Sequence, residues 1–404
     1  MMNDYIKINS RQYWKTIIAL FLGSFVTFAL LYSVQPLIPV FSEEFNVPPS
    51  LSSLTVSLAT GGLAVSMLFM SGLSDAVGRK RIMTIALLGS AGLTVLAACS
   101  TGFLPLLLLR FLQGLVLAGF PAIAMAYINE EFDPATVGLV IGIYVSGNSL
   151  GGLGGRLLVS ALTDFFSWHV ALGLLGIGCI ALSLWFYFNL PNSKHFTTNK
   201  MTFTARLASL QEELSHGKML ALYGTGFAVM GSFIAVYNYI GYSLMAPPYN
   251  LSQTIVGCLF LIYLVGTFSS TFMGKMADEK GSATVLCLAV GIMLAGVLLT
   301  LAVNLYLKIL GLAILTFGFF GSHSVASSWV GKCAVTGKAQ AASLYLLFYY
   351  IGSSVIGTIG GEFLLWNGWT GVVILVGAVL AGTFLLALWL WASEQSVGYA
   401  KQQH

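Results

Sequence analysis

Residues 71–83 read SGLSDAVGRKRIM and place four charged side chains within seven positions, between two long apolar stretches. Charged residues make up only 8% of the 404-residue chain, whereas hydrophobic residues make up 57% and the mean hydropathy is +0.88. Soluble proteins carry about 25% charged residues. The chain is therefore predicted to be an integral membrane protein, and the charged stretch is predicted to be a short loop between two membrane spans.

Twelve apolar stretches divide the chain into spans. A helix of about 20 apolar residues crosses the hydrocarbon core of a bilayer. The predicted spans are residues 14–41, 53–74, 82–100, 104–128, 137–161, 169–190, 219–243, 253–274, 283–303, 306–328, 339–362 and 370–391. One long polar interval separates the sixth span from the seventh. We therefore expect an N-terminal six-helix bundle in 1–190, a cytoplasmic central loop in 191–218 and a C-terminal six-helix bundle in 219–404.

The distribution of basic residues predicts the orientation. With the N-terminus in the cytoplasm, fifteen of the 18 Lys and Arg residues fall in cytoplasmic segments, as the positive-inside rule requires. The remaining three are Lys308 in an outer loop and Arg110 and Arg156 within spans. The first apolar run is too long for the core of a signal peptide, so it is expected to stay as the first helix. These features predict a multi-pass plasma membrane protein with both termini cytoplasmic. If the cell is Gram-negative, this membrane is the inner one.

The two halves resemble each other. Asp75 in the quoted loop has a counterpart in Asp278, 203 positions later. Two further pairs, at offsets of 205 and 201, are Tyr144 with Tyr349 and Trp168 with Trp369. A nearly constant offset indicates an internal repeat. We expect an all-α membrane protein with twelve transmembrane helices in two six-helix bundles, related by a pseudo-two-fold axis normal to the membrane.

Three motifs carry a resemblance to a known family. Gly72, Asp75, Gly78, Arg79 and Lys80 resemble the loop signature of the major facilitator superfamily, in its expected place between spans 2 and 3. In span 4, Arg110, Gln113 and Gly114 are similar to the family's R-x-x-Q-G signature. In span 5, residues 147–152 are similar to the antiporter signature G-P-x-x-G-G, with Asn148 in place of the proline. Within the family, the chain is similar to the twelve-span drug/proton antiporters.

The resemblance implies a secondary active transporter that works by alternating access. It favours proton-coupled efflux of a small amphipathic solute, such as a drug-like compound, a sugar or a siderophore-like metabolite, and it leaves proton-coupled uptake of a small metabolite as the alternative. A membrane-embedded enzyme or a receptor is disfavoured, because five scattered histidines form no convergent polar set and no large soluble segment is present. We expect no cofactor, no metal and no nucleic-acid partner. The lipid bilayer is expected to surround the chain, and the protein is expected to be a monomer.

The charged loop is predicted to act as a conformational latch. Gly72 and Gly78 would permit a tight turn, and Asp75 would face the positive N-terminus of a neighbouring helix. The acidic segment 129–133 offers partners for Arg79 or Lys80. In the family, this cluster is held to stabilise the outward-facing state by tying the halves together on the cytoplasmic side, and Asp278 marks the second copy. A topology signal alone would explain the basic residues, but it would not explain Asp75.

Charges inside spans are candidates for proton coupling. A charge near the centre of a span costs on the order of 3 kcal/mol, so Arg110 is expected to face a cavity or a partner, and Gln113 shares its helical face. The family reading gives Arg110 a coupling role, while hydrogen bonds to backbone carbonyls would make it structural. Arg156 lies nearer the outer end, where Asp164 or Glu362 could compensate its charge, and both function and a structural ion pair remain open.

Two further residues could exchange protons. His323 in span 10 could titrate near neutral pH, although a lone histidine also serves as a packing residue. Glu362 is the acid most clearly placed within a span, close to the span's end.

Aromatic and amide side chains suggest the solute pathway. By family analogy spans 1, 4, 7 and 10 line the cavity. The candidate substrate-binding residues are Phe28, Tyr32, Gln35, Asn148, Asn238, Tyr242 and Tyr345. Aromatic walls with a few amides suit an amphipathic or ring-containing solute, and they suit ordinary helix packing equally well. Pro36 and Pro39 are expected to kink or end span 1.

Overall fold

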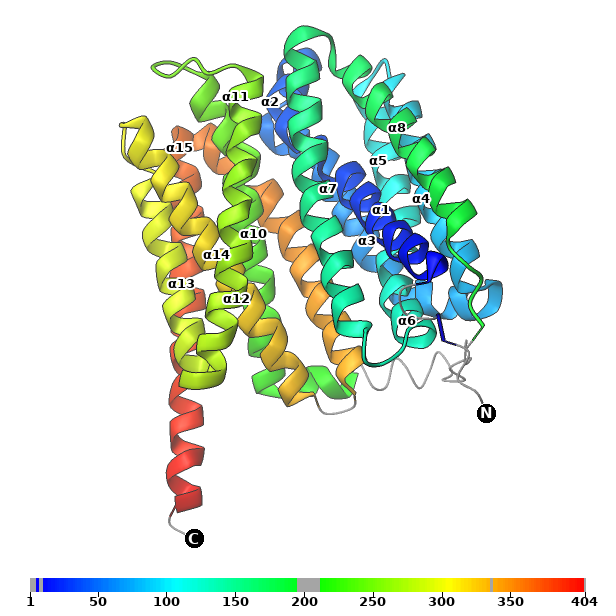
Figure 1. The fold of residues 1–404 in the computed structure, drawn as a ribbon. Helices are drawn as coiled ribbons and strands as arrows, with labels where there is room; N and C mark the ends of the chain where they lie inside the picture. Colours follow the sequence, from blue (N-terminus) through cyan, green and yellow to red (C-terminus); the bar gives the residue numbers. More distant parts are fainter. Residues whose placement is uncertain (1–4, 7–9, 195–210, 335–336, 403–404) are drawn as a thin grey trace. The chain divides into compact units, whose positions relative to one another are not determined.

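The chain folds into long helices joined by short connections (Figure 1). The computed structural model describes residues 5–6, 10–194, 211–334 and 337–402. Within these ranges, eleven helices are long and apolar enough to cross a membrane. The last of them, Gln340–Gln395, contains non-helical backbone at Asn367 and Gly368 and therefore accounts for two predicted spans. The predicted all-α fold is confirmed, and the chain is a multi-pass membrane protein.

The elements follow the labels of Figure 1. Those of the first half are α1 (Arg11–Tyr32), η1 (Gln35–Leu37), α2 (Ile38–Glu44), α3 (Pro49–Val77), α4 (Arg79–Ala98), α5 (Phe103–Leu117), α6 (Pro121–Glu131), α7 (Val137–Phe165) and α8 (Trp168–Asn189). Those of the second half are α10 (Gly217–Met245), α11 (Gln253–Cys258), η2 (Leu259–Ile262), α12 (Tyr263–Lys280), α13 (Ser282–Leu299), α14 (Leu305–Cys333) and α15 (Lys338–Gln402).

The first span is interrupted, as its prolines predicted. Helix α1 ends at Tyr32, a 3₁₀ segment follows as η1, and α2 continues the path. Pro36 lies within η1, where its missing N–H and its ring are incompatible with a continuous α-helix. Pro39 lies in the first turn of α2, a position that tolerates proline because no N–H is needed there.

Two other spans are broken where we expected continuous helices. The span predicted at 104–128 is divided into α5 and α6, with Pro121 at the start of α6. The span predicted at 253–274 contains η2, a 3₁₀ segment of four residues between α11 and α12. The prediction of unbroken helices was wrong at both places. A stretch of 3₁₀ helix inside a longer helix often marks a hinge.

The internal repeat is visible in the backbone. Gly78 has φ/ψ of 103°/140°, and Gly281, 203 positions later, has 89°/141°. Asn46 and Asn250, 204 positions apart, have φ of 50° and 49°. Positive φ is readily adopted by glycine and tolerated by asparagine. The same unusual conformations therefore recur at matching turns of the two halves.

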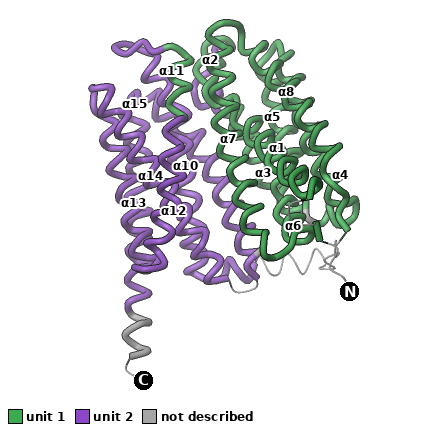
Figure 2. Tube along the Cα trace, viewed as in Figure 1, with its two compact units in different colours: residues 1–45, 54–200, 252–260 green, residues 46–53, 201–251, 261–404 purple. Residues whose placement is uncertain are grey.

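The chain forms two compact units, and each unit takes one short segment from the other half of the sequence (Figure 2). Unit 1 comprises residues 1–45, 54–200 and 252–260, and unit 2 comprises residues 46–53, 201–251 and 261–404. Helix α11 thus belongs to unit 1, and the first turn of α3 belongs to unit 2. The expected bundles, 1–190 and 219–404, follow the order of the sequence and contain no such exchange. Residues 195–210 of the expected central loop lie outside the described residues.

Glycines allow close contact between helices inside each unit. Helix α7 faces α1 with one glycine per turn, at Gly147, Gly151 and Gly155. A Cβ atom at Gly151 would lie 2.1 Å from the carbonyl oxygen of Phe25. In unit 2, a Cβ atom at Gly352 of α15 would lie 2.0 Å from the carbonyl oxygen of Phe227 in α10. Small residues permit such contacts in membrane bundles, so any side chain at these positions would push the helices apart.

Candidate functional site

A buried charge network lies at the turn between α3 and α4 in unit 1. Arg79 begins α4, and its Nε and Nη2 donate to the two carboxylate oxygens of Glu130 at 2.9 and 2.6 Å. Its Nη1 donates to Ser74 Oγ at 3.3 Å and to Asp75 Oδ1 at 3.4 Å. The side chains of Arg79, Asp75 and Glu130 are 8%, 14% and 18% exposed. A bidentate guanidinium–carboxylate pair is among the strongest polar contacts, so this network ties α3, α4 and α6 together.

The predicted acidic partner of Arg79 is confirmed, but the predicted role of Gly72 in the turn is not. Glu130 lies in the acidic segment 129–133, as predicted. Lys80 lies with its ammonium 5.1 Å from the centroid of the Tyr187 ring, a cation–π contact. Gly72 was expected to form the turn, but it lies within helix α3, and only Gly78 has the positive φ that the turn requires. Every contact of the network described above lies inside unit 1.

A neighbouring acid, Glu131, organises the same end of unit 1. Its carboxylate oxygen accepts from Ser193 Oγ at 2.6 Å and from the Lys194 backbone N–H at 2.7 Å. Its backbone carbonyl accepts from the N–H of Ile6 at 3.1 Å. Glu131 is buried, and it holds the start of the central interval and a residue near the N-terminus against α6. Glu131 belongs to the acidic segment 129–133, but its contacts with these two segments were not predicted.

The second copy of the loop, in unit 2, carries a simpler pair. Asp278 Oδ1 accepts from Lys332 Nζ at 2.9 Å. The two side chains are 72% and 53% exposed. Position 282, which corresponds to Arg79 in the repeat, is serine. The copy therefore keeps the aspartate and its glycine turn but has no arginine between the helices.

Arg110 is held by backbone carbonyls. It lies in α5 with only 1% of its surface exposed. Its Nε donates to the carbonyl oxygen of Thr55 at 2.8 Å, and its Nη2 donates to that of Leu31 at 2.6 Å. A further bond joins Nη1 to Gln113 Oε1, and Gln113 Nε2 donates to Thr94 Oγ1 at 2.7 Å. This arrangement matches the structural interpretation of Arg110, in which the guanidinium fixes α1, α3 and α5 to one another.

Arg156 has a different environment, between two aromatic rings. Its Cζ lies 4.4 Å from the centroid of Tyr32 and 4.7 Å from that of Phe260. Its Nε donates to Gln35 Oε1 at 2.9 Å, and its Nη1 donates to the carbonyl oxygen of Gly152 at 2.8 Å. Only 2% of Arg156 is exposed. The structure thus brings together two predicted substrate residues, Tyr32 and Gln35, and a predicted coupling residue.

The remaining unit 1 candidates lie along the contact between α1 and α7. The ring of Phe28 is 6.3 Å from that of Tyr32, and Phe28 is partly exposed. Asn148 Oδ1 accepts a hydrogen bond from Ser24 Oγ of α1, next to the glycines of α7. Phe28 therefore extends the Tyr32–Arg156 group along α1, whereas Asn148 contacts α1 about two turns away from Tyr32.

Asp164 caps a helix. Its carboxylate oxygens accept from the backbone N–H groups of Gln253 and Thr254, at 3.2 and 2.7 Å. These are the first residues of α11, where N–H groups have no partner inside the helix. Gln253 Nε2 donates to the carbonyl oxygen of Pro36 at 2.5 Å. The sequence suggested Asp164 as a partner for Arg156. Its hydrogen bonds instead join α11 to α7 within unit 1.

Aromatic side chains gather around His323 in unit 2. The His323 Nδ1 lies 3.0 Å from the hydroxyl of Tyr345, and the His323 ring centroid lies 4.7 Å from that of Tyr349. The cluster continues through Phe319, whose ring stacks on Phe233 of α10 at 3.7 Å. His323 is partly exposed, whereas Tyr345 is buried. A predicted coupling residue and a predicted substrate residue therefore form one hydrogen-bonded pair.

The other unit 2 candidates are separate from this pair. Asn238 is buried in α10, with Gly357 of α15 beside its amide. Tyr242 is partly exposed, and its ring lies 6.3 Å from that of Tyr239. Glu362 lies in α15 and is exposed. Asn238 and Tyr242 lie on α10, and Glu362 lies on α15.

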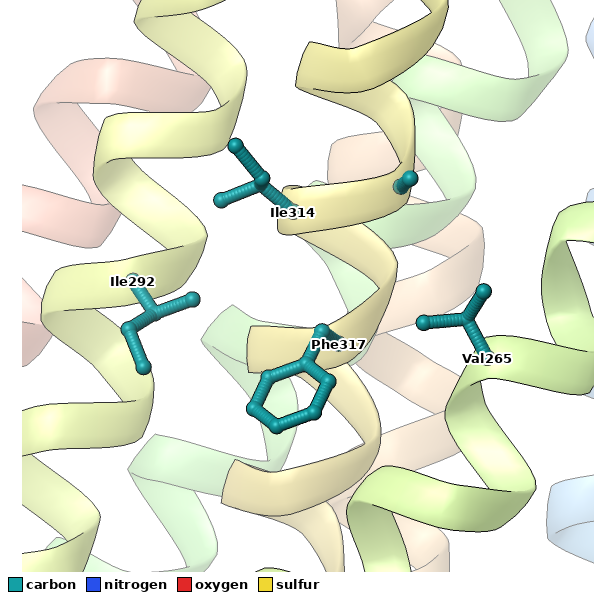
Figure 3. A pocket seen from close by; sticks show the side chains of 5 residues that line it. Val265, Ile292, Ile314 and Phe317 are labelled. Atoms are coloured by element: carbon teal, nitrogen blue, oxygen red, sulfur yellow. The ribbon is translucent and has the colours of Figure 1, made fainter.

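An apolar pocket lies between α12, α13 and α14 (Figure 3). It is lined by Val265, Ile292, Ala313, Ile314 and Phe317. A solute site needs a few polar groups for orientation, and none of these five side chains supplies one. We therefore do not count it among the solute sites. Within the described part of the chain, no three His, Cys, Asp or Glu side chains gather as metal ligands.

Two contacts of the site were not predicted. Phe260 follows Arg156 by 104 positions and belongs to the other sequence half, so no local pattern pairs them. Lys332 was placed only as a cytoplasmic basic residue, and the second copy of the loop at Asp278 was the available signal for its ion pair.

Comparisons with known proteins agree with these features. A model of the Major Facilitator Superfamily matches residues 20–354. An uncharacterized MFS-type transporter of Bacillus subtilis, YybF, is 45% identical over 96% of this chain and 95% of its own. The Escherichia coli inner membrane transport protein YnfM is 43% identical over 95% of this chain and 93% of its own. A bacterial homologue of the human lysosomal transporter Spinster shares the fold, with a TM-score of 0.74 at 14% identity over 94% of this chain and 95% of its own.

Proposed function

Because the chain belongs to the Major Facilitator Superfamily and is a transporter rather than an enzyme, we propose that it exports a small amphipathic solute in exchange for protons. The exporter would work by alternating access, in the plasma membrane or, in a Gram-negative cell, the inner membrane. Both termini and the Arg79 network would lie on the cytoplasmic side, and residues 1–190 and 219–404 would form the two moving bundles around the central loop 191–218. The protein would act as a monomer.

The glycine face of α7 is the observation that carries the proposal for export. Residues 147–152 resemble the antiporter signature, and Gly147 and Gly151 lie directly against backbone carbonyls of α1. A smooth contact of this kind allows two helices to pack closely while one slides against the other. Asn148 stands where the signature has proline, and it bonds to Ser24 of α1, so the closeness of α1 and α7 is kept without proline.

Proton exchange is assigned to His323. The imidazole is partly exposed and shares a hydrogen bond with Tyr345, and imidazole is the side chain suited to gain and lose a proton near neutral pH. Arg110 is left with a structural role, because its donors are taken by carbonyls and Gln113. Glu362 is exposed and is a second candidate proton carrier.

Reconstitution in liposomes tests the proposal. The purified protein is placed in vesicles with an imposed pH gradient, and the vesicles are screened against amphipathic dyes, sugars and siderophore-like metabolites. Solute movement opposite to proton movement is expected, and it should become independent of the gradient in His323→Gln. His169→Gln is the matched control, because His169 bonds only to a backbone carbonyl of unit 1. Solute and protons moving in the same direction would contradict export and favour uptake.

A further inference from the structure

Arg156 is a permanent positive charge buried among the helices of unit 1. Its guanidinium stays protonated at all physiological pH values, and it is 98% buried within helices that cross the membrane. Charged residues in such helices are costly and usually mark a solute or ion pathway. The guanidinium lies against two rings, with its Cζ 4.4 Å from the centroid of Tyr32 and 4.7 Å from that of Phe260. These contacts and its hydrogen bonds to Gln35 and to the carbonyl of Gly152 restrict its orientation.

Two of the side chains that contact Arg156 from other elements, Gln35 and Phe260, lie at helix breaks. Gln35 is the first residue of η1, which interrupts the first span, and Phe260 is the second residue of η2, which interrupts the eighth. Discontinuous helices are the usual walls of solute sites in transporters, because irregular backbone at membrane depth is tolerated where it lines a cavity. Two breaks meeting at one buried arginine are an observation independent of the charge.

The comparison with Arg110 shows what is particular to Arg156. The acceptors of Arg110 include carbonyls of α1 and α3, which cannot move away without unwinding a helix. The acceptor of Arg156 Nε is the side-chain amide of Gln35, which can rotate. An incoming ligand can therefore replace Gln35 as the acceptor of this N–H while the helices stay intact.

From these contacts we infer that Arg156 binds the anionic group of the transported solute, and that the solute class is an organic carboxylate with an aromatic or other apolar body. The guanidinium fork matches the two oxygens of a carboxylate, and the rings of Tyr32, Phe28 and Phe260 offer apolar surface to the remainder of the molecule. This inference rests on the proposed function as a transporter of a small amphipathic solute, and it gives Arg156 a role in solute recognition rather than in proton coupling.

Matched acid and amide pairs provide the test. The purified full-length protein in detergent is titrated calorimetrically with benzoate, phenylacetate and 1-naphthoate and with benzamide, phenylacetamide and 1-naphthamide. At least one carboxylate should bind wild type about tenfold or more tightly than its amide. Because a charge-assisted hydrogen bond contributes roughly 1.5–3 kcal/mol, Arg156→Gln should reduce carboxylate affinity about ten- to a hundredfold and leave amide affinity nearly unchanged.

A second variant keeps the test decisive if Arg156→Gln fails to fold. Gln35→Glu keeps the size of the side chain and places a carboxylate beside Arg156 Nε, so it should remove the preference for acids over amides. Lys308→Gln is the matched control, because Lys308 is a buried cation in unit 2, bonded to the carbonyl oxygen of Thr300 at 2.6 Å, and the acid preference should survive there.

The inference is overturned if no carboxylate binds wild type more tightly than its amide, or if the preference persists in Gln35→Glu. Binding in detergent needs no gradient, so the result is separate from the transport assay. An acid preference without proton movement in vesicles would refute proton-coupled export and leave the role of Arg156 standing.

Discussion

The turns at Gly78 and Gly281 have the same backbone, but they carry different charge networks. In unit 1, Arg79 lies between Glu130 and Asp75 with 8% of its side chain exposed. In unit 2, the pair formed by Asp278 and Lys332 is 72% and 53% exposed. Exposed ion pairs contribute about 0–1 kcal/mol, whereas removing one partner of a buried pair costs about 3–5 kcal/mol. The two repeats therefore share the backbone turn, but only the ion pairs of unit 1 are expected to contribute strongly to stability.

The largest effect is expected from Arg79→Gln. Removing the guanidinium leaves the partly buried carboxylates of Glu130 and Asp75 without their shared cation, which should lower the free energy of unfolding by about 3 kcal/mol. Unfolding in mixed micelles by titration with SDS measures this change. A loss below about 0.5 kcal/mol would mean that the network contributes no more than the exposed pair of unit 2, and the contrast between the units would disappear.

Glu130→Gln should have the next largest effect. Arg79 keeps its contacts with Ser74 and Asp75 but loses the bidentate partner, so we expect a loss of about 2 kcal/mol in the same titration. Glu279→Gln is the control for the loss of one negative charge, because Glu279 is exposed near the end of α12. Equal losses in both variants would show that net charge, and not the bidentate contact, is what matters.

Asp75→Asn should have a smaller effect on stability and a visible effect on conformation. The contact between Asp75 and Arg79 is long, at 3.4 Å, so about 1 kcal/mol is expected. If the network acts as the proposed latch, the variant should populate inward-facing states more and transport more slowly. Cysteine accessibility from the two sides of the membrane measures the population. Unchanged labelling together with an unchanged transport rate would remove the latch role.

Asp278→Asn should have the smallest effect, below about 0.5 kcal/mol. The pair that it breaks is solvent-exposed, and 0.5 M salt should weaken it in wild type. The SDS titration at low and high salt checks both statements. A loss comparable to that of Glu130→Gln would show that the second copy is as strong as the first despite its exposure.

Most of the fold followed from the sequence, because membrane spans are set by length and hydropathy. The Asn367–Gly368 interruption separates the last two spans close to where the polar residues suggested. The breaks at Pro121 and at η2 were missed. Pro121 is the same kind of signal that predicted the break in the first span, but it was not used for this span. At η2, an apolar run gives no sign that its hydrogen bonding changes from α to 3₁₀. The placement of Gly72 in a turn was wrong for a related reason. Inside α3 nothing forces the helix to end before Gly78, so a glycine six residues earlier is simply part of the helix.

The site was predictable where the partners are close to a recognisable motif. The bond between Arg79 and Glu130 could be predicted because the acidic segment 129–133 follows span 4 on the same, cytoplasmic side of the membrane as the loop of Arg79. The surroundings of Arg156 did not follow, because Phe260 reaches it through the exchange of segments between the units. His323 and Tyr345 were each selected for a different role, and only the structure joins them in one hydrogen bond.

The exchange of segments 46–53 and 252–260 between the units bears on how the protein is made. When the ribosome has finished α8, unit 1 still lacks α11, which caps onto Asp164 only after α10 has been synthesised. The first turn of α3 packs closely against α15, where Gly361 approaches Ser50. Because Gly361 lies near the end of the chain, this contact can form only late in synthesis. Unit 1 can therefore be completed only after α11 has been made, and unit 2 only after α15, so neither unit can finish folding from its own half of the sequence alone.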